Sequence, residues 1–349
     1  MIERSWTRPL DPLSDNLKSK IKNLKSSGLS IVAFVLVVAG AMAEAQQPKK
    51  APRIGFLSVG TASAMSTRIE AFRRGLREQG YIEGQDIVVE YRYAEDNLER
   101  LREFAAELVR LKVDVIVTGG TISTRPAKEA AGATPIVMAY ESDPVGSGLV
   151  TSLARPGGNL TGLTSSAGEL NGKRLELLKE AIPKLSRVAV IRNPGMSNAA
   201  QALKEAETAA QSLKLKIQLL EVQSPNDLEG LFAAAKKGRA EGMVVVGDPV
   251  TFTHRKRMAD LALKNRIATI HGQMQFAEAG AMMVYGPNDA DMYRRAATYV
   301  DKILKGSKPA DLPIERPVKF DFIINLKTAK QIGLTIPPNV LARADRVIR

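Results

Sequence analysis

The chain of 349 residues has no cysteine and only two histidines, His254 and His271. Without cysteine there is neither a disulfide framework nor a cysteine for lipid attachment. The two histidines do not stand in an HExxH or another paired-ligand spacing, so a zinc or iron site is not expected. The composition therefore predicts a protein with no metal and no cofactor.

Motifs of the common catalytic and nucleotide-binding sites are also missing. There is no GxSxG, no GxxxxGK[ST], and no GxGxxG after the first predicted strand. A lone Gly146-Ser147-Gly148 is typical of a flexible turn. The sequence thus predicts a protein that is not an enzyme.

Aromatic residues make up only 5% of the chain, while its net charge is +13. The lysines and arginines are scattered at ordinary spacing, apart from the short run His254-Arg255-Lys256-Arg257, and aromatic residues do not alternate with them. A nucleic-acid-binding protein gathers its basic residues on one face or stripe. We therefore expect a solvated basic surface and no nucleic-acid partner.

The first 45 residues have the composition of a targeting segment. Four lysines between residues 18 and 25 lead into the apolar run 29–39, and small residues follow at 41–45. This order predicts a secretory signal over 1–45, with a polar linker over 46–52. The run is short for a membrane span, although an uncleaved single-span anchor is the alternative. Removing six basic and four acidic side chains would leave a mature protein of about +11.

Beyond the linker, short apolar segments alternate with helical patterns. The pattern predicts strands at 53–59, 86–93, 113–117 and 135–139, and again at 187–191, 216–222, 242–246 and 267–270. Strand-like segments at 281–285 and 319–324 flank a helix at 289–304. Alternation of this kind predicts an α/β protein with two Rossmann-like, doubly wound parallel-sheet lobes.

The two halves repeat one plan about 130 residues apart, and the Pro-Gly-Gly at 156–158 interrupts the rhythm between them. We expect an N-terminal lobe of residues 53–158 plus 282–308 and a C-terminal lobe of residues 159–281 plus 309–349. Several chain crossings would then form a hinge, with a cleft between the lobes.

The segment 113–124, VDVIVTGGTIST, is the strongest local candidate for a binding site. A buried strand ends in a glycine turn that opens a helix, and free N–H groups at a helix start favour anions. The sequence predicts that Gly120 and Thr121 hold a carboxylate. Its counterpart GMVVVGDPVTF presents Asp248, which with Asp143 would hold an ammonium, while Tyr285 or Phe252 would cover a side chain. The alternative is that such residues only cap helices.

Several long segments resemble one known family. They are residues 53–55, 71–84, 105–120, 142–162 (SDPVGSGLVTSLARPGGNLTG), 172–180, 285–288 (YGPN), 299–313 and 324–337. Together they resemble the ABC transporter substrate-binding family that includes tryptophan and tyrosine binders. The resemblance implies a type I periplasmic-binding-protein fold, two lobes that close on a small-molecule ligand, and delivery to a permease with its ATPase.

The resemblance also implies that the pocket comes from the strand exit loops. It places candidate ligand-binding residues at Ser58, Thr61, Gly120, Thr121, Ser142, Asp143, Asn193, Asp248 and Tyr285. Tyr140 and Glu141 depart from the family pattern, in which small residues are usual at these positions.

We therefore expect a periplasmic solute receptor that binds an amino acid, with aromatic amino acids among the candidates. It would be a monomer that meets the membrane only through its permease. The alternatives are an exported sensory or ligand-binding module, and an exported α/β enzyme of unknown substrate. A sugar-responsive repressor core would share the fold but carry a DNA-reading helix pair in place of the signal.

Overall fold

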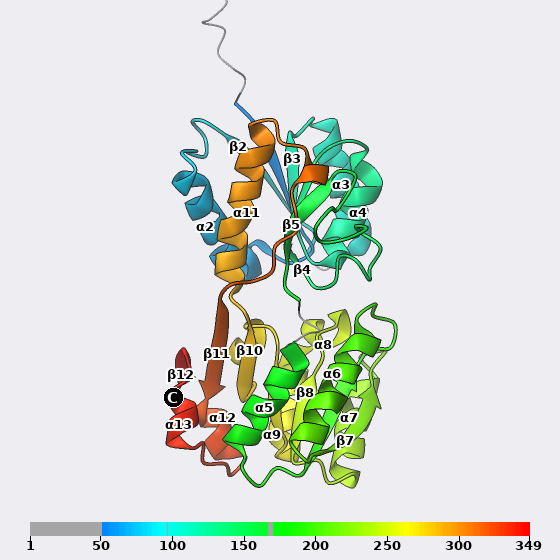
Figure 1. Cartoon of the computed structure of the whole chain (residues 1–349), viewed down its shortest axis with the longest axis vertical. Helices are drawn as coiled ribbons and strands as arrows, with labels where there is room; N and C mark the ends of the chain where they lie inside the picture. Colours follow the sequence, from blue (N-terminus) through cyan, green and yellow to red (C-terminus); the bar gives the residue numbers. More distant parts are fainter. Residues whose placement is uncertain (1–50, 96, 167–169) are drawn as a thin grey trace, which may run out of the picture. The chain divides into compact units, whose positions relative to one another are not determined.

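The structure is a computed structural model that describes residues 51–95, 97–166 and 170–349. The predicted signal over 1–45 and most of the 46–52 linker lie outside the described residues. In the part of the chain that is described, no helix has both the length and the apolar composition needed to cross a membrane. Figure 1 shows how the helices and strands of the described chain are arranged around two sheets.

The first sheet contains β1 (Arg53–Ser58), β2 (Val88–Tyr93), β3 (Val115–Gly119), β4 (Ile136–Glu141) and β5 (Leu160–Thr164). Their order is β2-β1-β3-β4-β5, and every pairing is parallel. Val115, Ile116 and Val117 in β3 are all inaccessible to solvent. A parallel strand that is covered on both faces is expected to be a continuous apolar run of this kind.

Helices cover both faces of the first sheet. On one face α3 (Leu98–Arg110) and α4 (Thr121–Ala131) pack over the sheet, and on the other lie α2 (Ala62–Glu78) and α11 (Asp289–Leu304). The last two lie side by side (Figure 1). Gly75 permits this close approach, because a Cβ there would stand 2.2 Å from the carbonyl oxygen of Arg294. A helix from late in the chain thus completes the first lobe.

The second sheet has the order β12-β11-β10-β9-β8-β6-β7. Its strands are β6 (Arg187–Arg192), β7 (Lys216–Glu221), β8 (Gly242–Val245), β9 (Ala268–His271), β10 (Met283–Pro287), β11 (Phe320–Asn325) and β12 (Arg346–Ile348). All pairings are parallel except β10 with β11. The predicted fold of two mostly parallel α/β lobes is confirmed. The β10–β11 pair is antiparallel because the chain leaves β10 for α11 and returns in β11 from the same end.

The helices of the second lobe again occupy both faces. They are α5 (Asn171–Ala181), α6 (Ala199–Ser212), α7 (Asp227–Lys237), α8 (Pro249–Thr253), α9 (Arg255–Asn265), α10 (Gln275–Glu278), α12 (Leu326–Gln331) and α13 (Pro338–Leu341). A 3-10 turn at Pro309–Asp311 instead contacts β5 of the first sheet. The order β2-β1-β3-β4 in the first sheet matches β7-β6-β8-β9 in the second. This is the internal repeat that the sequence pattern predicts.

Strand pairing shows which sheet each segment joins where the chain passes between the two sheets. Residues 160–164 form β5, which pairs with β4 in the first sheet. Residues 283–287 form β10, which pairs with β9 in the second sheet, and the chain then enters α11, which packs against α2. The return segment lies beside the first sheet at Glu315, whose N–H donates to the carbonyl oxygen of Gly162. The lobe boundaries given by the sequence stay a prediction.

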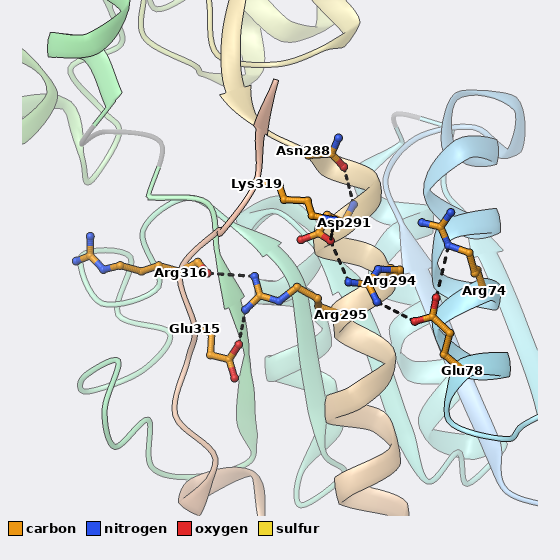
Figure 2. A network of polar contacts seen from close by, with 9 residues as sticks. All are labelled: Arg74, Glu78, Asn288, Asp291, Arg294, Arg295, Glu315, Arg316 and Lys319. Carbon is orange, nitrogen blue, oxygen red and sulfur yellow. Dashed lines mark hydrogen bonds and ion pairs between the residues drawn. The ribbon is translucent and has the colours of Figure 1, made fainter. Parts of the chain in front are cut away.

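The start of α11 is held by neighbours on two sides, as Figure 2 shows. Arg294 donates to Glu78 of α2 at 2.7 Å, and on the other side Lys319 of the return segment lies 3.5 Å from Asp291. Arg295 donates to the carbonyl oxygen of Arg316 at 3.2 Å. These contacts fix the first turns of α11 between α2 and the segment that leads into β11.

Candidate functional site

The glycine turn between β3 and α4 already holds a carboxylate that belongs to the chain. Glu141 at the end of β4 accepts hydrogen bonds through Oε1 from the Thr121 hydroxyl and from the backbone N–H of Ser142, the latter at 3.0 Å. Glu141 is inaccessible to solvent, and burial raises the pKa of its carboxyl. The Thr121 hydroxyl, predicted to help hold a ligand carboxylate, thus bonds to a carboxyl group of the chain itself, while the N–H of Gly120 donates to the carbonyl oxygen of Tyr140. Their contact with a ligand stays a prediction.

Asp248, at the matching turn of the second lobe, caps a helix. Its Oδ1 accepts from the backbone N–H groups of Val250 and Thr251 at 2.8 and 3.2 Å, and its Oδ2 accepts from the Thr251 hydroxyl at 2.6 Å. The residue is 4% exposed, and burial raises its pKa. The capping alternative accounts for all of these contacts, and a role for Asp248 in holding an ammonium stays a prediction.

Two other predicted site residues also stabilise their own turns. The Ser58 hydroxyl accepts from the N–H of Gly60 at 3.1 Å, and the Thr61 hydroxyl caps α2 by accepting from the N–H of Ala64 at 3.2 Å. A hydroxyl can donate and accept at once, so Ser58 keeps a hydrogen to donate. The Thr61 hydroxyl makes a second hydrogen bond, with the Ser63 hydroxyl at 3.0 Å. Ser58 and Thr61 lie at the carboxyl end of β1, where the sequence predicts them.

The exit loops of β4 and β6 meet through one hydrogen bond. Asp143 accepts from the hydroxyl of Ser197 at 3.2 Å, while its other oxygen accepts from the N–H of Gly146 at 2.8 Å. Asn193 in the same β6 loop accepts from the N–H of Gly195 at 3.0 Å. This hydrogen bond joins the loop after β4, which carries the predicted residues Ser142 and Asp143, to the loop after β6, which carries Asn193.

Tyr285 packs within the β10–β11 pair. Its ring stacks on Phe320, with ring centroids 5.9 Å apart, and meets Phe322 edge to face at 6.3 Å. Its carbonyl oxygen accepts from Nε of Arg174 at 2.9 Å. The second predicted ring, Phe252, meets Phe276 edge to face at 6.4 Å. Contacts within the fold account for the positions of both rings, and their covering of a ligand stays a prediction.

Sequence reasoning missed Asp289, the first residue of α11. Asn288 caps this helix by accepting from the N–H of Asp291 at 2.7 Å (Figure 2), so the carboxylate of Asp289 is not needed as a cap. Its Oδ2 instead accepts from Arg68 of α2, through Nε at 3.1 Å and through Nη2, and from Nε2 of Gln275 at 3.1 Å. Asp289 directly follows the YGPN segment at 285–288, but only Tyr285 of that region was predicted to bind the ligand.

The other oxygen of Asp289 is buried without a hydrogen bond. The side chain is 9% exposed, and Oδ1 has no hydrogen-bond partner within 51–95, 97–166 and 170–349. An unsatisfied buried acceptor of this kind is rare and costly in folded proteins. It calls for a donor that the described chain does not supply.

Two tyrosines accompany the Arg68–Asp289 pair. The Arg68 guanidinium lies over the ring of Tyr293, 5.8 Å from its centroid. Burial raises the pKa of Tyr293 to about 12 and also raises that of Tyr140, so both phenols stay neutral. Burial opposes the charge of Arg68, but the neighbouring carboxylate of Asp289 outweighs that effect and raises the pKa of the guanidinium. The site thus combines a buried ion pair with aromatic surface.

Arg174 and His271 form a second buried polar group that the sequence did not indicate. Arg174 donates to Asn171 Oδ1 at 2.8 Å, and a Cβ at Gly272 would stand 2.4 Å from its Nη2. Burial lowers the pKa of Arg174 to about 10. Burial, aided by Arg174, lowers the pKa of His271 to about 3, so its imidazole is neutral where it stacks on Phe276. In the sequence Arg174 looks like one more charge on an exposed helix face.

The described residues contain no cluster of three or more histidine, aspartate or glutamate side chains that could hold a metal ion. The strand ends carry hydrogen-bonding groups, the guanidinium groups of Arg68 and Arg174, several buried carboxyls and aromatic rings. Such a set can bind a small polar ligand that has an apolar part.

Comparison with known proteins gives one consistent result. The family model described as ABC transporter substrate binding protein matches residues 54–348. A curated protein of Clostridioides difficile (strain R20291), named "Tyrosine-binding protein", is 24% identical over 286 residues, which cover 82% of each chain.

Solved structures agree on the fold. A conserved domain protein from Vibrio cholerae is 26% identical with a TM-score of 0.75, covering 85% of this chain and 100% of that one. An ABC domain from Streptococcus pneumonia in complex with L-Trp has the same TM-score at 23% identity, covering 85% of this chain and 99% of that one. The two-lobed fold is shared with both.

Proposed function

The chain belongs to the ABC transporter substrate-binding protein family, and we propose that its ligand is an amino acid, with an aromatic amino acid as the first choice. Proteins of this family bind a small molecule and work with the permease components of an ABC importer; they are not enzymes. Substrate-binding proteins of importers act outside the cytoplasmic membrane.

The observation that carries the proposal is the Arg68–Asp289 pair beside Tyr140 and Tyr293. An amino acid carries an ammonium and a carboxylate on one carbon, so its site needs acceptors and donors close together. The unsatisfied oxygen of Asp289 would supply an acceptor, and the half-buried ring of Tyr140 would supply aromatic surface for a side chain. The names of a tyrosine-binding relative and of an L-Trp complex point to the same ligand class.

In this proposal the site residues predicted from the sequence surround the ligand. Ser58, Thr61, Gly120, Thr121 and Ser142 would line the first lobe, and Asp143 with Asn193 would meet the ligand where their two loops join. Tyr285 would contribute from the second lobe. In the same proposal a signal over residues 1–45 directs the protein to the periplasm, and the protein acts as a monomer with a permease and its ATPase.

A thermal-shift screen followed by calorimetry tests the proposal. The purified protein is heated with each of the twenty amino acids, and with a sugar and a nucleoside as controls. A ligand at a hundred times its Kd should stabilise the protein by about 2.7 kcal/mol, which is readily seen as a higher Tm. We expect the largest shifts with L-tryptophan or L-tyrosine. A shift with the sugar or nucleoside and none with any amino acid would refute the proposed ligand class.

A further inference from the structure

The two carboxylate oxygens of Asp289 have different surroundings. Three N–H groups converge on Oδ2, whereas Oδ1 is buried and has no partner in the described chain. A carboxylate oxygen accepts more than one hydrogen bond, and buried polar atoms in native proteins nearly always have a partner. The arrangement therefore points to a donor that arrives from outside the chain.

The position of Asp289 matches that of a ligand-binding residue. It follows the carboxyl end of β10, and its side chain is bonded to Gln275, which follows β9, and to Arg68 of α2. In open α/β sheets this end of the strands is where ligands bind. The Asn288 cap and the ion pair between Arg294 and Glu78, both shown in Figure 2, fix the start of α11. They hold the backbone of Asp289 in place without using either of its carboxylate oxygens.

The chemistry of the free atoms specifies the kind of donor. Oε1 of Gln275, like Oδ1 of Asp289, is buried and without a partner in the described residues, and the two side chains are hydrogen-bonded to each other. Both free atoms are acceptors. A primary ammonium, with a positive charge and three N–H donors, satisfies two neighbouring acceptors at once, and its bond to a carboxylate is of the strong, charge-assisted kind.

We propose that Asp289, through Oδ1 and together with Oε1 of Gln275, receives the α-ammonium group of the ligand. This inference rests on the proposed function, because it concerns the same site and needs an amino-acid ligand. It makes Asp289 the residue that selects an amino acid over the corresponding acid without an ammonium. It also replaces the sequence-based hypothesis that Asp248 and Asp143 hold this group.

The test pairs two ligands with matched variants. Calorimetric titrations measure the binding of L-tryptophan and of indole-3-propanoate, which lacks the ammonium, to the wild-type protein and to Asp289→Asn. L-tyrosine and its desamino analogue replace this pair if the screen favours tyrosine. We expect Asp289→Asn to weaken the amino acid at least tenfold and its desamino analogue less than threefold.

The matched control is Asp301→Asn on the same helix. Asp301 is 6% exposed and paired with Lys305, so it is as buried as Asp289, but its contacts are with Tyr81 and Lys305. This variant should bind both ligands within threefold of wild type. Gln275→Met is the second test variant. Methionine has an uncharged side chain of similar length but lacks Oε1. We expect this variant to lose less affinity for the amino acid than Asp289→Asn does, and to bind the desamino analogue as the wild type does.

The outcomes separate this inference from the proposed function. If the wild-type protein binds amino acids and Asp289→Asn binds them within threefold of wild type while folded, the inference is wrong. It is equally wrong if Asp248→Asn loses the amino acid selectively and Asp289→Asn does not. If Asp289→Asn does not fold, an unaltered preference for the amino acid in folded Gln275→Met overturns it. If the wild-type protein binds no amino acid, the proposed function fails first.

Discussion

Asp248 and Asp289 occupy comparable places in the second sheet but have different partners. Each follows a strand, each stands at the start of a helix, and each is less than 10% exposed. Asp248 has no other capping residue beside it, so its oxygens bond to the first turn of α8. Asp289 follows Asn288, which performs the capping, so its carboxylate is available for Arg68 and Gln275.

The difference shows how one residue decides the role of the next. A carboxylate that must cap its own helix satisfies the backbone and has little left for a ligand. A carboxylate that does not cap its own helix can pair with groups from distant elements and keep one oxygen without a hydrogen bond. A rule that treats every acidic residue after a strand as equivalent therefore cannot tell these two roles apart.

Removing the cation from Asp289 should give the largest effect on stability. Arg68 and Asp289 have side chains 17% and 9% exposed, so the Arg68→Ala variant leaves a buried charge without its cation. Breaking a buried ion pair on one side costs about 3–5 kcal/mol. Denaturant unfolding of Arg68→Ala and wild type at pH 7 measures the difference.

Arg73→Ala provides the comparison for Arg68→Ala. Its partners Glu70 and Glu83 are exposed or half-buried, and we expect a loss of at most about 1 kcal/mol. Equal losses in the two variants would show that the Arg68–Asp289 pair is no more buried in solution than an ordinary surface pair.

Substitutions of Asp248 should have a smaller effect that depends on the new side chain. Asp248→Ala removes the cap of α8 and leaves the Thr251 hydroxyl without its carboxylate partner, which should cost about 1–2 kcal/mol. Asp248→Asn should cost much less, because asparagine caps a helix as well as aspartate does. The unfolding midpoints of the two variants measure this. If Asn proves as costly as Ala, the charge of Asp248, rather than its capping bonds, is what matters.

The sequence predicts the framework of the fold well, because it depends on local patterns. The apolar period gives α11 its observed bounds of 289–304, and the run RVAVI locates β6 at its observed start. The internal repeat gives the order of four strands in each sheet. The strand β5 was missed because Gly157 and Gly158 before it and the glycine within it are turn signals. The strand β12 is only three residues long.

The candidate site is less predictable because its pairings span the whole chain. Arg68 and Asp289 are 221 positions apart, and no local pattern joins them. Local rules correctly nominate helix starts such as Gly120–Thr121, but they do not show that Glu141, twenty positions later, accepts a hydrogen bond from the Thr121 hydroxyl. Whether a carboxylate caps a helix, forms an ion pair or is available to a ligand depends on its neighbours in the folded structure.

Glu141 extends the comparison to the first sheet, where we expect the smallest effect. The Glu141→Gln variant keeps an oxygen that can accept from Thr121 and from the Ser142 N–H, so the hydrogen bonds survive. Burial raises the pKa of Glu141 in the folded protein above its unfolded value of about 4.3, so the folded state holds the proton more tightly. The contribution of Glu141 to stability therefore falls as pH rises from about 4.3 through the folded pKa.

Glutamine does not titrate, so the variant should lack this part of the pH dependence. Denaturant unfolding at intervals from pH 4 to pH 8 measures the free energy of unfolding of both proteins. The value for Glu141→Gln minus the value for the wild type should increase with pH and level off above the pKa of Glu141 in the folded protein. A difference that is constant across this range would mean that Glu141 titrates normally and that its carboxylate is solvated. In that case the β3–α4 turn would be open to a ligand carboxylate, and the contrast between filled helix starts and the free oxygen of Asp289 would hold only for the second sheet.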